Sequence, residues 1–71
     1  MIDGAHPVEF DDVRVLRAND LVMLCWVGSR IVEVAPQHIL PGTTVSGQND
    51  RGRLVLPREL AITLGLIWKP G

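Results

Sequence analysis

Residues 21–34 read LVMLCWVGSRIVEV, in which two apolar runs flank the pair Gly28-Ser29. Each run has the length of a β-strand and is bounded by turn-forming residues. A two-residue loop that opens with glycine predicts a β-hairpin, because a type II′ turn requires a positive φ at its first central residue. We therefore predict strands over residues 21–27 and 30–34.

The loop length also predicts the register of this hairpin, with Val27 opposite Arg30 and Met23 opposite Val34. Because side chains alternate between the faces of a strand, both faces become largely apolar. One face carries Met23, Cys25, Val27, Val32 and Val34, and the other carries Val22, Leu24, Trp26 and Ile31, interrupted by Glu33. We expect a partner subunit to cover the second face. The alternative is that the C-terminal helix and the Pro-rich connection over residues 35–44 cover it.

The remaining segments predict a small sheet and one helix. Val13 and Val15 alternate with Arg14 and indicate a short strand, and residues 53–56 indicate another. Within the connection, the apolar pair Ile39-Leu40 is expected to insert into the core as a hydrophobic plug. Pro57 is suited to the first position of a helix, which Gly65 would end with a left-handed cap. The expected fold class is mostly β with one short C-terminal helix (α+β), as a small barrel-like sheet that could form an interleaved dimer.

Length and composition limit the class of protein. The chain has 71 residues, 46% of them hydrophobic, which is enough for one domain with a modest core. A lone cysteine and two histidines predict no disulfide, no metal site and no cofactor, so a second copy is the expected source of added stability. No signal peptide or membrane span is apparent, and we expect a soluble, cytoplasmic protein.

Charge divides the chain into two parts. The first thirteen residues hold four acids and no Lys or Arg, namely Asp3, Glu9, Asp11 and Asp12. We predict an acidic flexible arm over residues 1–10, with a loosely docked strand as the alternative, and a single small β-rich domain over residues 11–71. The net charge of −1 excludes a chain that coats nucleic acid by charge alone. Six of the seven basic residues are arginines, whose planar fork suits phosphate and carboxylate.

Residues 50–66 read DRGRLVLPRELAITLGL: a Gly-Arg turn, an apolar strand, a proline, a short helix and Leu-Gly-Leu. This order resembles the signature of the AbrB/SpoVT-type swapped-hairpin proteins. In that family a second hairpin follows, whereas here a similar stretch lies upstream, over residues 16–34. The resemblance therefore implies a circularly permuted or rearranged relative, with residues 21–27 and 53–56 in one sheet.

The same resemblance implies an interleaved homodimer that binds DNA and acts as a transcriptional regulator. By motif position, the DNA-binding residues would be Arg51 and Arg53, which flank Gly52, and Arg58 after the proline. Arginines are well suited to contacts with phosphates and base edges. The alternative for Arg51 and Arg53 is that they only solvate a hairpin tip.

A second function class is a protein-binding module, such as an antitoxin or a phage-type inhibitor or regulator of a host polymerase or nuclease. The acidic arm would then meet a basic partner, and the apolar sheet face of Leu24, Trp26 and Ile31 would supply the partner or dimer contact. Trp68 would be a further anchor. The alternative is a solvated arm, with Trp68 closing the core.

Catalysis has little support in the sequence. Cys25 with His38 as its base is the strongest nucleophile candidate, but Cys25 lies inside an apolar strand, where cysteine usually acts as a small hydrophobe. Ser29 has no partner at a suitable spacing. His6 with Asp3 and Asp11 could touch a metal, yet the sequence indicates no ordered scaffold there. We expect no enzyme activity and no catalytic residue.

Overall fold

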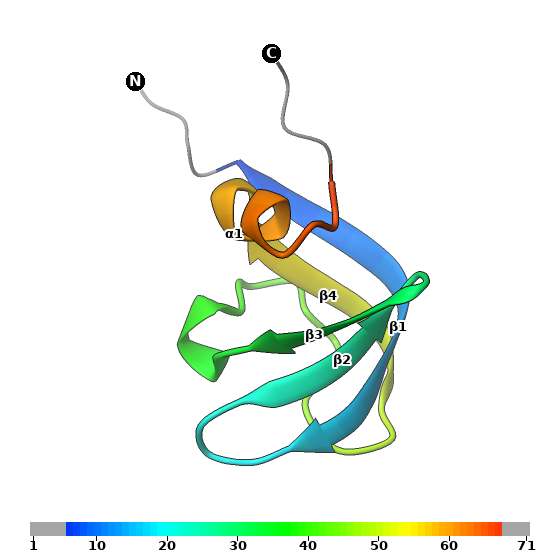
Figure 1. Ribbon diagram of the computed structural model, residues 1–71. Coiled ribbons are helices and arrows are strands. Elements are labelled where there is room, and N and C mark those ends of the chain that lie inside the picture. Colours follow the sequence, from blue (N-terminus) through cyan, green and yellow to red (C-terminus); the bar gives the residue numbers. More distant parts are fainter. Residues whose placement is uncertain (1–5, 68–71) are drawn as a thin grey trace.

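The computed structural model describes residues 6–67. These residues form β1 (Pro7–Ala18), β2 (Met23–Val27), β3 (Arg30–Val34), the 3-10 helix η1 (Pro36–His38), β4 (Arg51–Pro57) and α1 (Arg58–Thr63). The strands make one antiparallel sheet in the order β3-β2-β1-β4 (Figure 1). The expected fold class, mostly β with one short C-terminal helix, is confirmed. The sheet is not closed, because β3 and β4 are its two edges, so "barrel-like" describes its curvature only.

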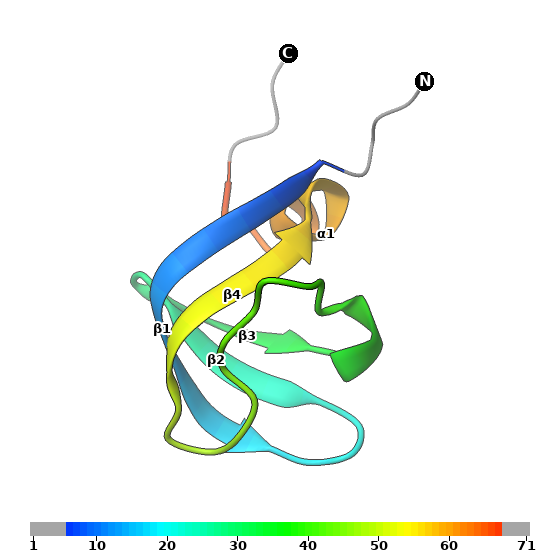
Figure 2. The same cartoon turned by 180° about the vertical axis from the view of Figure 1, so that it is seen from behind.

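β1 is long and bent, and it pairs with β4 on one side and with β2 on the other. Its register with β4 shifts between Phe10 and Val13, and its register with β2 shifts between Val15 and Arg17. At the first bulge Asp12 has a φ of 57°, a left-handed conformation that increases the bend. Figures 1 and 2 show the result, a strand that follows β4 over its first half and β2 over its second. The sheet thereby curls around its core.

Part of the predicted arm takes the alternative form, a strand, since β1 begins at Pro7. Val8 pairs with Leu56 and Phe10 with Leu54, so residues 7–10 are an integral part of a central strand. Val8 and Phe10 are half-buried while Pro7 and Glu9 are exposed, which is the alternation of a strand with one solvated face. The rest of the predicted arm, residues 1–5, lies outside the described residues.

The predicted hairpin is confirmed in its register. Val27 pairs with Arg30 and Met23 with Val34, and Gly28 has the required positive φ, 61°. β2 is two residues shorter than predicted. The side-chain oxygen of Asn19 accepts hydrogen bonds from the backbone N–H groups of Leu21 and Val22, at 2.8 and 2.9 Å, and so holds both residues in the preceding turn.

The core lies on the concave face of the sheet. Its buried members come from all four strands and the segment before β4: Val13, Val15, Met23, Cys25, Val27, Val32, Val34, Val45, Leu54 and Leu56. Ile39 packs against this cluster, as the predicted plug requires, and so do Leu60, Leu64 and Leu66 from α1 and the turn after it. The second half of the plug, Leu40, is half-buried.

The ends of α1 follow the predicted chemistry with one correction. Pro57 is the N-cap residue with extended backbone (φ −60°, ψ 144°), not the first helical residue. At the other end Gly65 has a φ of 77°, and the N–H groups of Leu66 and Gly65 donate to the carbonyl oxygens of Ala61 and Ile62 at 2.9 and 3.0 Å. This pair of bonds is a Schellman ending, and Gly65 forms the left-handed cap predicted from the sequence.

The two segments that carry the family resemblance share the sheet but are not neighbours. β1 lies between β2 and β4 and pairs with both. A permuted arrangement requires a common sheet, and this requirement is met. The resemblance itself stays a prediction.

Candidate functional site

One row of side chains crosses the convex face of the sheet from edge to edge. Ile31 pairs with Trp26, Trp26 with Arg14, and Arg14 with Arg51. Directly paired residues share a face, so all four side chains lie on the same side. Ile31 is 56% exposed and Trp26 46%, and both arginines are exposed. An aromatic and an aliphatic side chain thus lie side by side in solvent, next to two guanidinium groups.

A second row lies beside the first. Glu33 pairs with Leu24, and Leu24 with Arg17. We call the two rows together the outer face: Arg14, Arg17, Leu24, Trp26, Ile31, Glu33 and Arg51. α1 and the connection pack on the opposite, concave side through Leu60, Leu64 and Ile39. The alternative, that these two segments cover the second face of the hairpin, is therefore wrong, and the expected coverage by a partner stays a prediction.

The arginines of the outer face differ in their partners. Nη2 of Arg51 lies 3.6 Å from Oδ1 of Asp12, and both side chains are largely exposed, so this ion pair contributes little to stability. Within the described residues 6–67, Arg14 and Arg17 form no ion pair. Arg14 and Arg51 face each other on paired strands, where like charges repel. A cavity of about 260 Å³ between them is lined by Asp12, Arg14, Trp26, Gly28 and Arg51.

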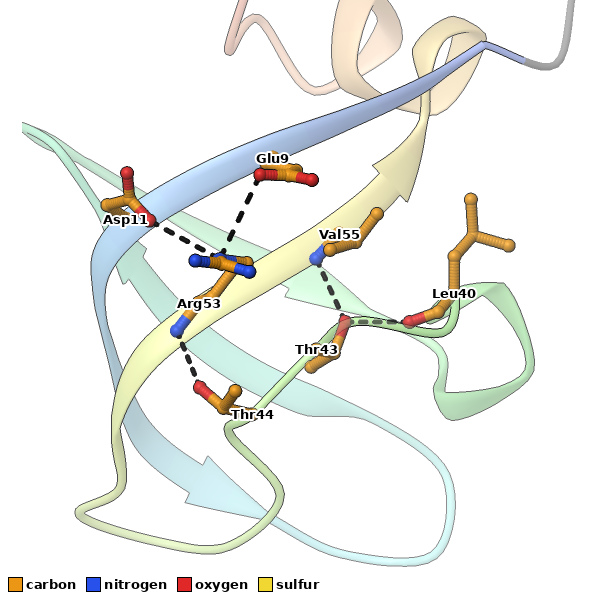
Figure 3. A network of polar contacts seen from close by, with 7 residues as sticks. All are labelled: Glu9, Asp11, Leu40, Thr43, Thr44, Arg53 and Val55. Carbon is orange, nitrogen blue, oxygen red and sulfur yellow. Dashed lines mark hydrogen bonds and ion pairs between the residues drawn. The ribbon is translucent and has the colours of Figure 1, made fainter.

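Of the three arginines predicted to bind DNA, only Arg51 and Arg53 lie close together, two positions apart on the same side of β4. Arg53 also lies beside two carboxylates, with its Nε 3.5 Å from Oδ1 of Asp11 and 3.9 Å from Oε1 of Glu9 (Figure 3). Arg58 begins α1 beyond the end of β4. At about 3.3 Å per residue, it is about 20 Å along the strand from Arg51.

The acids of the predicted arm are the partners of these arginines. The bulge in β1 places Asp11 and Asp12 opposite Arg53, with Asp12 reaching Arg51. Each of these exposed pairs is weak, about 0–1 kcal/mol. Their effect is on charge: the acidic arm and the basic body inferred from the sequence largely neutralise each other within one chain. Asp3 lies outside the described residues.

Gly52 does not form the turn that the family signature implies. It lies inside β4 opposite Val13, and its φ is not positive. A side chain at this position would collide with the hydroxyl of Thr44. The glycine therefore permits the close approach of another segment to the edge of β4.

That segment, residues 40–44, covers the edge of β4 (Figure 3). The N–H groups of Leu40 and Thr44 donate to the carbonyl oxygens of Val55 and Arg53, at 3.0 and 2.9 Å. The N–H groups of Val55 and Arg53 in turn donate to the hydroxyl oxygens of Thr43 and Thr44, at 2.9 and 2.8 Å. The outward backbone groups of Arg53 and Val55 are therefore satisfied. The sequence analysis missed this role, whose only signal is the consecutive threonines after Pro41-Gly42.

The catalytic candidates Cys25 and His38 differ in burial. Cys25 is fully buried in the core, while His38 is exposed on η1. Among residues 6–67, no group of three or more His, Cys, Asp or Glu side chains is placed to hold a metal ion. Trp68, the predicted anchor, lies outside the described residues.

Burial raises the pKa of the Cys25 thiol to about 11. We expect iodoacetamide to leave the native protein unmodified at pH 8 and to label it in denaturing urea, as mass spectrometry would detect. Because the folded-state pKa lies above the unfolded one, the thiol's contribution to stability is complete below about pH 8.5 and lost as the pH rises towards 11. A Cys25→Ala variant should lack this part of the alkaline loss. Rapid labelling of the native protein would contradict the burial.

In the part of the chain from His6 to Ile67, no helix is long and apolar enough to cross a membrane. No protein-family model, curated protein or solved structure matches this chain significantly.

Proposed function

We propose that this chain is a small protein-binding module that docks through its outer face. The observation that carries the proposal is the exposure of Trp26 and Ile31 at directly paired positions, 46% and 56%, with Leu24 beside them. Tryptophan and arginine are the residues most enriched among those that dominate binding energy at protein interfaces. Here one tryptophan lies between an aliphatic residue and the pair Arg14 and Arg51.

The charges of the outer face favour a partner with an apolar surface bordered by carboxylates. Three arginines stand against Glu33 and the nearby Asp12, and Arg14 and Arg17 have no ion pair among residues 6–67. Of the acids expected to attract a basic partner, Glu9, Asp11 and Asp12 are instead engaged with Arg51 and Arg53. A module of this kind would act as an antitoxin, or as an inhibitor or regulator of a larger enzyme, by covering part of its surface. A homodimer fits this role, because two copies would present two such faces.

DNA binding by a transcriptional regulator is the second candidate. The observation that favours it is the cavity between Arg14, Trp26 and Arg51, where a base could stack on the indole while guanidinium groups contact phosphates. Three arginines per chain would give a modest, salt-sensitive affinity. The exposed Ile31 contributes nothing to such a contact, which is why we rank it second.

The test is a capture experiment from the native host with three forms of the full chain, each with and without nuclease. Wild type should retain a protein after nuclease treatment. Trp26→Ala should weaken its binding about 30-fold or more. Leu21→Ala removes a side chain that is 78% exposed but outside the outer face, and should bind like wild type.

Two results would overturn the proposal. One is capture that disappears with nuclease, together with retardation of duplex DNA by the purified protein that depends on Arg14 and Arg51; this result supports DNA binding. The other is equal capture by wild type and Trp26→Ala, which would place any docking surface elsewhere.

A further inference from the structure

The two edges of the sheet differ in whether another segment of the chain covers them. The edge of β4 is covered by residues 40–44, which satisfy the outward backbone groups of Arg53 and Val55. At the other edge, no hydrogen bond from residues 6–67 reaches the outward side of β3. An uncovered edge strand is a template for pairing with another chain.

The hairpin register identifies the open groups. In a two-residue hairpin the residues that flank the loop, Val27 and Arg30, form a hydrogen-bonded pair, and such pairs alternate with non-bonded ones. Arg30, Val32 and Val34 therefore direct their backbone groups towards β2. Ile31 and Glu33 direct theirs outward. Both of these residues have exposed side chains.

We propose that a second copy of this chain adds its β3 antiparallel to this edge, about a two-fold axis at Val32. Ile31 then exchanges both backbone hydrogen bonds with Glu33 of the partner subunit, and Glu33 exchanges both with the partner's Ile31. The strand is self-complementary because Ile31 and Glu33, whose backbone groups point outward, lie one on each side of the axis. Four new hydrogen bonds form.

Other two-fold registers of the same strands are poorer. An axis at Glu33 sets two carboxylates directly opposite each other, where like charges destabilise the pair. An axis at Ile31 leaves Glu33 opposite residue 29, which belongs to the turn, so only one hydrogen-bonded pair forms. The axis at Val32 has neither defect.

This register joins the two outer faces. The row of Arg51, Arg14, Trp26 and Ile31 continues into Glu33, Leu24 and Arg17 of the partner subunit, which adds one carboxylate and a third arginine to a row that carries two arginines. The two outer faces then lie on the same side of one eight-stranded sheet. The proposal goes beyond the proposed function, since it rests on the open edge alone and holds whether or not the face binds a protein.

The test compares Glu33→Pro with Glu33→Ala in the full chain by sedimentation velocity over a range of concentrations. Wild type and Glu33→Ala should dimerise. Proline at 33 removes only an outward N–H, which an edge strand tolerates, so the bonds to β2 remain. It removes two of the four new hydrogen bonds, and at about 1 kcal/mol each the dimer dissociation constant should rise about 30-fold.

Hydrogen exchange supplies a second measurement, on the unmodified protein. The amides of Ile31 and Glu33 should become protected as concentration rises, while those of Val32 and Val34 stay protected throughout. A monomer with fast exchange at Ile31 and Glu33 at all concentrations would overturn the proposal. So would a dimer unchanged by Glu33→Pro with a native circular dichroism spectrum. If Glu33→Pro unfolds the chain, the exchange pattern alone decides.

Discussion

Replacing Leu54 by alanine should lower the free energy of unfolding by about 3 kcal/mol, within the 2–5 kcal/mol typical of buried leucines. Leu54 is fully buried in β4, opposite Phe10, in the part of the core that joins β1 to β4. The loss combines the removed apolar contact with the cavity left behind. A chain of this size has a total stability of about 5 kcal/mol, so the variant should be close to unfolding at 37 °C. Urea denaturation followed by circular dichroism measures the effect.

Leu21→Ala is the matched control, because it is the same change at a side chain 78% exposed. Its effect should stay within about 0.5 kcal/mol. Equal effects of the two changes would mean that the β1–β4 half of the sheet contributes little to the folded state.

Replacing Thr43 and Thr44 together by valine should destabilise the protein by about 3 kcal/mol. Both hydroxyl oxygens accept hydrogen bonds from backbone N–H groups of β4, and a valine of similar shape accepts none. Val55 is only 3% exposed, so its N–H would be buried without an acceptor, at a cost of about 1–3 kcal/mol. Thr43 also loses its bond to the carbonyl oxygen of Leu40. Urea denaturation again measures the change.

Thr63→Val is the control for the change of residue type, since Thr63 is exposed at the end of α1. A small effect there and a large one at the edge would confirm that the hydroxyls act as acceptors. If the double variant is as stable as wild type, residues 40–44 do not hold the edge of β4. The double variant should also exchange the Val55 amide faster, as native-state hydrogen exchange would show.

The accuracy of the sequence analysis follows the range of the contacts involved. The hairpin register and the end of α1 were predicted correctly because two-residue turns and glycine caps act over a few residues. The choice between arm and strand for residues 7–10 could not be made, because their strand character depends on β4, 44 to 50 positions further along the chain. Gly52 was assigned to a turn, although its need for a small residue comes from Thr44 on a separate segment.

In the candidate site, too, local contacts could be predicted from the sequence and distant ones could not. Trp26, Ile31 and Leu24 could be placed on one face from the hairpin alone. The neighbouring positions of Arg14 and Arg51 could not, because they depend on the β1–β4 register on the far side of a bulge. The ion pairs of Arg53 depend on that bulge as well, and no local pattern in the sequence indicates where a strand will bulge.

The pairing of β1 with β4 has a consequence for synthesis of the chain. β1 leaves the ribosome first among the strands, and Pro7 pairs with Pro57 at the far end of β4. The β2–β3 hairpin can close early on its own contacts, whereas the first half of β1 has no partner until β4 has been translated. During that interval Val8 and Phe10 lie on an unpaired strand. Two acids, Asp11 and Asp12, follow directly in the sequence. Charges beside such a strand hinder its association with other nascent chains, so the same acids that later face Arg51 and Arg53 protect the chain before those arginines exist.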